Sequence, residues 1–357
     1  MLDRYLARQV LWFTVLVMGV LVTLAALFKF IEQQGDIGVG SYGTFDALFV
    51  TLLLLPQQAF VLLPIGALIG ALLGLGNLAR GSELIVIRAA GVSVTRVALA
   101  SAAAGVMLLV CGGIMGEVLA PPLEAYANQV KTLAKYDNFS FAGSAGIWVK
   151  DGNRILSIQD PSADSIYGGI YIYGLETGAD GRQHLATLAR ADRAELMRGQ
   201  SWRLHRYAAS LIGEDGVTTR QLATSQLESG INAEFLGAAS VDPASLPLRG
   251  LYRYVGYLRA NGQESRAWEV ALWSRIARSI STVLFCMLAV PFVFGKLRST
   301  GAGARTVVGI VIGVVFVLIN RTLENSGDVY GLSPLLVAWG PTALLAAATA
   351  IAIARVR

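Results

Sequence analysis

Long uncharged stretches alternate with short charged segments along most of the chain. The six longest lie at residues 9–28, 47–79, 97–116, 279–295, 306–320 and 329–354. An apolar helix needs roughly 20 residues to cross the hydrocarbon core of a membrane. The run 306–320 is shorter, but the arginines that border it can extend their charged groups toward the membrane surface. The pattern therefore predicts six transmembrane helices, three before and three after a long central segment.

The central segment, residues 121–266, is far more polar and has the pattern of a β domain. Short alternating runs occur at 147–150, 154–158, 170–173 and 202–205, and Asp151-Gly152 is a signal for a two-residue hairpin loop. Turn-forming clusters recur at 178–181, 198–200 and 213–216. Short strands with regular turns indicate an antiparallel sandwich or jelly-roll-like domain. Residues 121–136 and 244–266 are predicted to be helical connectors.

We therefore expect three regions: transmembrane helices 1–3 in residues 1–120, the β domain in 121–266, and transmembrane helices 4–6 in 267–357. Composition agrees with a membrane protein, since 54% of the residues are hydrophobic, only 15% are charged, and the mean hydropathy is +0.57. A soluble protein carries about 25% charged residues. Neither cysteine is expected to form a disulfide, because Cys111 and Cys286 both fall within predicted spans.

The distribution of basic residues predicts the orientation in the membrane. Arginines and lysines flank the beginning of the first run, the loops 80–96 and 296–305, and the end of the chain, whereas acidic residues predominate at the opposite ends. By the positive-inside rule both termini are cytoplasmic and the central domain lies outside, in the periplasm. The net charge of +5 thus reflects membrane topology, and nucleic-acid binding is not expected.

Two features of the first half indicate how the helices pack and where a partner could bind. Gly66, Gly70 and Gly74 recur every four residues, which predicts close approach of a second helix. Pro56 and Pro64 are expected to kink the same long helix. Residues 82–93 predict a short amphipathic cytoplasmic helix, with Ser82 as its N-cap and Gly91 at its end.

The sequence contains no recognisable catalytic or metal-binding pattern. No phosphate-binding loop, zinc-protease motif or nucleophile elbow is present, so neither a catalytic residue nor a metal site is predicted. Four cations stand near the ends of predicted spans: Lys29, Arg275, Arg278 and Arg321. They could simply reach the membrane surface, or they could line an inner cavity that accepts an anionic amphiphile.

Several segments in both membrane halves and in the β domain match one known family. They are Leu2-Asp3-Arg4-Tyr5, residues 64–76, Ser82-Glu83-Leu84, residues 88–93, residues 146–153 and residues 294–299. Together they resemble the LptF/LptG family of lipopolysaccharide export permeases, over essentially the whole chain. The resemblance implies a non-catalytic transporter subunit in the inner membrane of Gram-negative bacteria.

The resemblance also implies partners. A paralogous LptF-like permease would form the other half of a lipid cavity, and a dimer of the ATPase LptB would bind below and would be the component that holds ATP, so no cofactor is expected in this chain. LptC would join through a single helix, and the periplasmic bridge LptA would accept the lipopolysaccharide.

Family roles transfer to Glu83, Lys29 and Lys131, with Lys135 close by. Lipopolysaccharide binding is therefore expected at Lys29, Lys131 and Lys135, and also at Arg321 as one of the cations near span ends. ATPase coupling is expected in the segment around Glu83, at Ser82, Glu83, Leu84 and Arg88. The chain departs from the family at positions that are often basic, which are Gln34, Gly35 and Gln57 here. The cationic ring is therefore expected to be thinner than in familiar members.

Two other classes of protein were compatible with parts of the pattern. One is a mechanical membrane protein of the lipoprotein-release kind, although these typically have four spans and a large domain after the first. The other is an intramembrane enzyme, which the missing catalytic pairs disfavour. The arrangement of three spans, a central domain and three more spans favours the permease.

Overall fold

The computed structural model divides the chain into two compact units. The residues that it describes are 1–135, 147–161, 166–177, 183–197, 201–213, 216–228, 246–294, 301–329 and 331–356. The helical unit comprises Met1–Asp137 and Arg266–Arg357, and the β unit comprises Asn138–Ser265. The helix that follows the third span packs against the second span and belongs to the helical unit.

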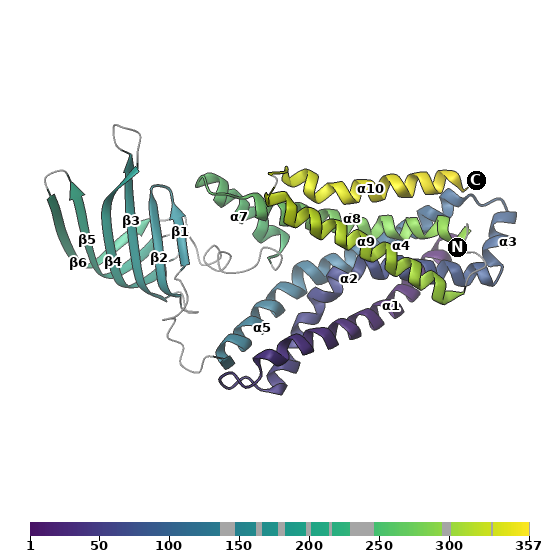
Figure 1. Ribbon diagram of the computed structural model, residues 1–357, viewed down its shortest axis with the longest axis horizontal. Helices are drawn as coiled ribbons and strands as arrows, with labels where there is room; N and C mark the ends of the chain where they lie inside the picture. Colours follow the sequence, from purple (N-terminus) through teal and green to yellow (C-terminus); the bar gives the residue numbers. More distant parts are fainter. Residues whose placement is uncertain are drawn as a thin grey trace. The chain divides into compact units, whose positions relative to one another are not determined.

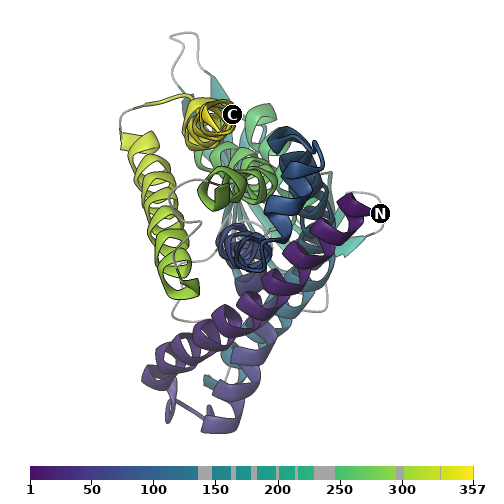
Figure 2. The same ribbon diagram turned by 90° about the vertical axis from the view of Figure 1, so that its right-hand side faces the viewer.

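The helical unit contains, within the described residues, six helices long and apolar enough to cross a membrane, which confirms the prediction. They are α1 (Leu2–Gln33), α2 (Thr44–Arg80), α4 (Val94–Ile114), α8 (Arg266–Phe294), α9 (Ala302–Val329) and α10 (Pro334–Arg355). A π-helical turn, η2 (Met115–Leu119), joins α4 to α5 (Ala120–Lys135), and the short η1 (Gln34–Asp36) follows α1. Figures 1 and 2 show that both chain ends lie at the end of this unit that also holds α3 (Glu83–Ala89).

Helix α2 is the centre of the helical unit, packing against α1, α5, α8 and α9. The glycine ridge makes the contact with α1, as the spacing predicted: a Cβ added at Gly70 would lie 2.7 Å from the Thr14 backbone nitrogen, and one at Gly74 would lie 2.9 Å from the Gln9 carbonyl oxygen. Pro56 and Pro64 lie inside one helix of 37 residues. At 1.5 Å per residue this helix is about 55 Å long.

The β unit is built on a six-stranded antiparallel sheet whose strands pair in chain order (Figure 1). The strands are β1 (Ile147–Asp151), β2 (Arg154–Pro161), β3 (Ile166–Thr177), β4 (Gln183–Met197), β5 (Ser201–Gly213) and β6 (Gly216–Glu228). The antiparallel β domain is thus confirmed. The first hairpin differs by one residue from the prediction: Asp151 pairs with Arg154, so Gly152 and Asn153 form the loop, and Gly152 supplies the positive φ of 58° that this tight turn requires.

A short helix, α7 (Leu248–Ala260), completes the described part of the β unit. The Tyr257 hydroxyl donates a hydrogen bond to the Lys150 carbonyl oxygen, and the Gly152 amide donates to the Asn261 side-chain oxygen at 2.8 Å. These bonds fix α7 to the first hairpin. Burial of the phenol raises the pKa of Tyr257 well above its ordinary value, so the hydroxyl stays protonated and able to donate.

Candidate functional site

The predicted coupling segment forms a helix, α3, that is held by sharp turns on both sides. Ser82 precedes it with a left-handed backbone (φ 60°) and makes no side-chain capping bond, so the predicted N-cap hydrogen bond is absent. Gly91 follows with φ 87°, a conformation that glycine adopts freely, and it ends the segment as expected. Ser93 then caps α4 by accepting a hydrogen bond from the Arg96 amide. The helix is therefore shorter than the predicted 82–93.

Leu84 anchors α3 to the rest of the helical unit. Its side chain is 1% exposed and belongs to the main apolar core. The guanidinium of Arg88 lies 5.5 Å from the ring centre of Phe294 on α8, a cation–π contact. Ile85 and Arg88 also border a hollow of about 320 Å³ that reaches Val293. Leu84 and Arg88 thus hold the helix in place beside this hollow.

The outward face of α3 combines one carboxylate with apolar side chains. Glu83 is exposed, Val86 is 66% exposed and Ile85 is 41% exposed. The Tyr5 hydroxyl, from α1, donates a hydrogen bond to Glu83 Oε2 at 2.7 Å. This bond orients the carboxylate without removing it from solvent. An apolar face with an oriented anion is suited to a partner surface that carries a cation.

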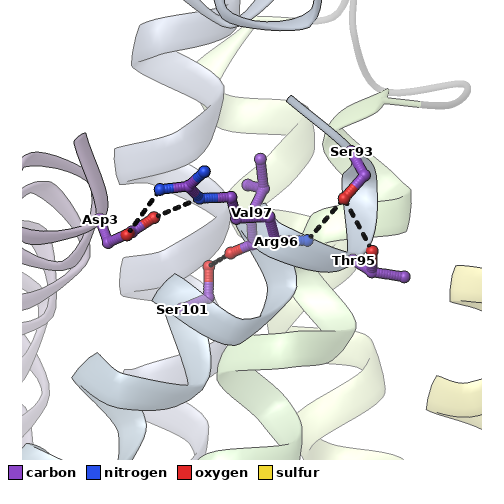
Figure 3. A network of polar contacts seen from close by, with 6 residues as sticks. All are labelled: Asp3, Ser93, Thr95, Arg96, Val97 and Ser101. Atoms are coloured by element: carbon purple, nitrogen blue, oxygen red, sulfur yellow. Dashed lines mark hydrogen bonds and ion pairs between the residues drawn. The ribbon is translucent and has the colours of Figure 1, made fainter. Parts of the chain in front are cut away.

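A second contact ties the start of α1 to the start of α4 (Figure 3). Arg96 binds the Asp3 carboxylate through both Nε and Nη2, at 3.2 Å each. The Ser93 hydroxyl also bonds to Thr95 Oγ1 at 2.9 Å, so the cap and the ion pair occupy one turn. The α1 N-terminus is therefore joined both to α3, through Tyr5, and to the helix that follows α3.

At the other end of α2, the structure brings two of the predicted lipid-binding lysines together. Asp36, in η1, pairs with Lys131 at 2.7 Å and also with Lys135, both on α5. Lys29 is on α1 and pairs with Glu32 at 2.8 Å. The three lysines and two carboxylates leave a net charge of +1. An anionic headgroup would therefore have to compete with Asp36 and Glu32 for the cations.

The loop between α1 and α2 holds Asp36 beside Lys131 and Lys135. The Ser41 amide donates to the Ala134 carbonyl oxygen at 2.7 Å, and Tyr42 is buried in a small core with Ala47 and Ala127. Gly40, with φ 61°, lies directly against the backbone carbonyls of residues 134 and 135, where a side chain could not fit. The loop is thus packed onto the end of α5.

Arg321, the fourth predicted lipid-binding residue, lies on a different side of α2. It lines a hollow of about 50 Å³ between α2 and α9 together with Arg278, Asn320 and Glu324. Arg278 pairs with Glu324 at 3.6 Å. The structure therefore does not place Arg321 in the cluster with Asp36, and the proposed contact of all four cations with one lipid stays a prediction.

The helical unit also contains a buried ion pair that the sequence did not reveal. Arg275 of α8 is 7% exposed and binds the Glu117 carboxylate through Nε and the Gly116 carbonyl oxygen through Nη2, the latter at 2.6 Å. Its guanidinium lies 5.2 Å from the ring centre of Phe60 on α2. Both acceptors belong to the π-helical turn η2. Arg275 therefore joins α2, η2 and α8.

Most of these partners are too far apart in sequence for a local pattern to identify. Tyr5 and Glu83 are separated by 78 positions, Asp3 and Arg96 by 93, and Glu117 and Arg275 by 158. The only usable signal was the cost of charge at membrane depth, which singled out Arg275 but not its partner.

Comparison with known proteins decides the family. The profile of the family described as "Lipopolysaccharide export system permease LptF/LptG" matches residues 4–355. The chain belongs to the LptF/LptG family. It is 33% identical to "Lipopolysaccharide export system permease protein LptG" of Haemophilus influenzae, over 96% of this chain and 95% of that protein. It is 32% identical to the protein of the same name in Escherichia coli K12, over 96% and 94% of the two chains.

Membership of the LptF/LptG family confirms the predicted fold, six membrane helices with a central antiparallel β domain, and the predicted function of a permease subunit in lipopolysaccharide export. It also makes the chain a multi-pass inner-membrane protein. Family membership therefore favours the permease over the lipoprotein-release alternative. The residues expected to bind lipid or the ATPase stay predictions.

Proposed function

We propose that this chain is the LptG-type member of the permease pair and that α3 transmits the work of a separate ATPase to the lipid cavity. The observation that carries the proposal is the position of α3. Its exposed Glu83, Ile85 and Val86 lie at one end of α2, and the cluster of Lys131, Lys135 and Asp36 lies at the other. One continuous helix thus links a protein-binding surface to a cationic surface.

The orientation proposed from the basic residues agrees with this division. Both chain ends lie at the α3 end of the helical unit (Figure 2). With this end in the cytoplasm, α3 would meet an ATPase dimer of the LptB kind, which would bind the ATP. The lysine cluster would then lie near the outer leaflet, and the β unit would lie in the periplasm, where an LptA-like bridge and LptC could reach it.

Helices α1 and α9 are the proposed walls of the cavity and of the contact with an LptF-like partner. Glycines on α9 pack against α2, since a Cβ added at Gly309 or Gly313 would lie 2.9 Å from Ile69 or Ile65. The opposite face of α9 is rich in exposed aliphatic side chains, among them Val311 (56%). A helix with one packed and one exposed apolar face is suited to a second protein or to lipid tails.

The test of coupling is the substitution Glu83→Arg in the full chain, coexpressed with its permease partner and ATPase. Reversing the charge on the outward face of α3 should lower copurification of the ATPase at least tenfold, while the amount of permease in the membrane stays unchanged. Glu264→Arg is the matched control, because Glu264 is an exposed glutamate in the β unit. Full copurification and normal transport by the Glu83 variant would refute the coupling role.

The lipid site is tested separately. Lys29→Asp should reduce photocrosslinking of lipopolysaccharide to α1, because it replaces a cation with a second carboxylate beside Glu32. Unchanged crosslinking would remove Lys29 from the site without affecting the proposed role of α3.

A further inference from the structure

The helix that carries Lys131 and Lys135 begins at a π-helical turn. Residues 94–135 run through α4, η2 and α5 without a break, and only η2 departs from α-helical geometry. At the end of η2 the Ala120 amide donates a hydrogen bond to the Met115 carbonyl oxygen, five positions earlier. An α-helical turn closes over four positions, so η2 contains one residue more than the α-helical turn that it replaces.

This additional residue determines the direction in which α5 presents its side chains. One residue corresponds to about 100° of rotation around an α-helix, because 3.6 residues complete a turn. If η2 became α-helical with the same residues, all of α5 would rotate by about that angle. A side-chain atom about 6 Å from the helix axis would then move by roughly 9 Å. Lys131 and Lys135 would both leave Asp36, with which they pair in this structure.

Contacts from α8 and α2 support the π geometry. Single π-helical turns within α-helices are rare and frequently lie at functional sites. Arg275 of α8 binds the Glu117 carboxylate through Nε and donates from Nη2 to the Gly116 carbonyl oxygen at 2.6 Å. Phe60 of α2 packs directly on Gly116, where an added Cβ would lie 2.6 Å from its ring. Both acceptors of Arg275 thus belong to η2, and the residue between the guanidinium and α2 is the same Phe60.

We propose that Arg275 is a positioning residue for the lysines of α5. By holding η2 in its π geometry, it fixes the direction in which Lys131 and Lys135 face Asp36 and an anionic lipid. Arg275 acts through the helix and not by touching the lipid, because Lys131 lies about 17 Å along α5 from its first residue, Ala120. The consequence for lipid rests on the proposed function of the lysines, whereas the direction of α5 rests on the geometry of η2 alone.

A carbodiimide crosslink reports the direction of α5 in the full chain, in nanodiscs that contain no lipopolysaccharide. The reagent joins a carboxylate to an amine that it touches, so Asp36 should form an amide with Lys131 or Lys135. Asp36 is 27% exposed and therefore accessible to a soluble reagent. Glu32 and Lys29 form the internal control, because both lie on α1 and their pairing does not involve α5. Mass spectrometry of the digested protein gives the ratio of the α5 amide to the α1 amide.

Arg275→Met should lower this ratio about fivefold or more, because a displacement of roughly 9 Å separates the lysines from Asp36. Deletion of Val118 from the Arg275→Met chain should restore the ratio. Removing one residue from η2 leaves an α-helical turn and keeps α5 in its original direction. Val118 is 65% exposed, so its deletion removes no buried side chain. A residue that only stabilised the fold would not be rescued by shortening the helix.

Deletion of Gln129 is the matched control, because Gln129 is exposed and lies in the regular part of α5. It rotates the lysines without altering η2, and it should lower the ratio even with Arg275 present. Deletion of Val118 alone should keep the ratio near that of the unmodified chain, which keeps the test decisive if Arg275→Met folds poorly. The proposal is overturned if Arg275→Met leaves the ratio unchanged, or if deleting Val118 lowers it as far as deleting Gln129.

Photocrosslinking of lipopolysaccharide to α5 in the same variants separates this inference from the proposed function. The yield should fall with Arg275→Met and return when Val118 is also deleted. A yield that stays constant while the amide ratio falls and recovers would remove Lys131 and Lys135 from the lipid site. The same result would still support the role of Arg275 in setting the direction of α5.

Discussion

The buried pair of Arg275 and Glu117 offers the sharpest test of how the helical unit is held together. Glu117→Leu would leave the Arg275 guanidinium, 7% exposed, without its carboxylate. Removing one member of a buried ion pair costs about 3–5 kcal/mol. Because the Glu117 side chain is 29% exposed, solvent screens part of this energy, and we expect about 2–3 kcal/mol for Glu117→Leu.

The double variant Glu117→Leu/Arg275→Met separates loss of charge pairing from loss of packing. Replacing both partners with apolar residues of similar volume is often nearly neutral. Here it also removes the contact with Phe60 and a hydrogen bond to Gly116, so we expect the double variant to cost about 1–2 kcal/mol, less than either single variant.

Unfolding in mixed micelles with increasing dodecyl sulfate, followed by tryptophan fluorescence, gives the free energies. Arg96→Gln is the matched control, because the Asp3–Arg96 pair is 52% and 58% exposed and should contribute no more than about 1 kcal/mol. The reasoning is refuted if Glu117→Leu costs no more than Arg96→Gln, or if the double variant costs the sum of the two single ones.

Three further results are expected. Gly70→Leu should prevent α1 from packing on α2 and reduce the amount of folded protein in the membrane several-fold, measured by detergent extraction and size exclusion. The control Gly113→Leu should be tolerated, because nothing lies within 4 Å of a Cβ added there. Equal yields of the two variants would contradict the packing argument. Asp36→Asn should strengthen binding of an anionic amphiphile about fivefold or more, because it frees Lys131 and Lys135 from their carboxylate partner. Lipid titration measures the affinity. Weaker binding by the variant would argue that Asp36 organises the site. Because the pKa of Tyr257 is raised in the folded protein, the neutral phenol stabilises the fold fully below pH ~10, and this stabilisation is lost as pH rises further. Hydrogen exchange in β1 and β2 should accelerate above that pH. Tyr257→Phe should abolish this part of the pH dependence of exchange.

The membrane spans could be predicted because the bilayer imposes a length and a polarity that each segment must meet alone. The glycine ridge on α2 could also be predicted, because its four-residue spacing lies within one segment, although the sequence did not show that α1 packs against it. In the β unit, β4 escaped the prediction. Its residues 183–197 are rich in alanine, leucine and arginine, which favour helices, yet Ala189, Ala191 and Ala194 are buried in the sheet. Pairing with β3 and β5 overrides the local preference.

The site was predictable only in part. The sequence singled out Lys131, Lys135 and Glu83 through family resemblance. It could not show that Asp36 neutralises part of the lysine charge or that Tyr5 orients Glu83. Such contacts depend on how segments many positions apart meet in three dimensions, and no periodicity within one segment encodes them.

The continuous α2 has a mechanical consequence. A continuous helix of about 55 Å acts as a lever: a tilt of about 10° about one end displaces the other end by roughly 10 Å. A small rotation imposed at Arg80, next to α3, could therefore separate Thr44 and its neighbours from the lysines of α5 by more than the reach of an ion pair. Large movement at the end near Lys131 and Lys135 then requires only slight movement at the end next to α3.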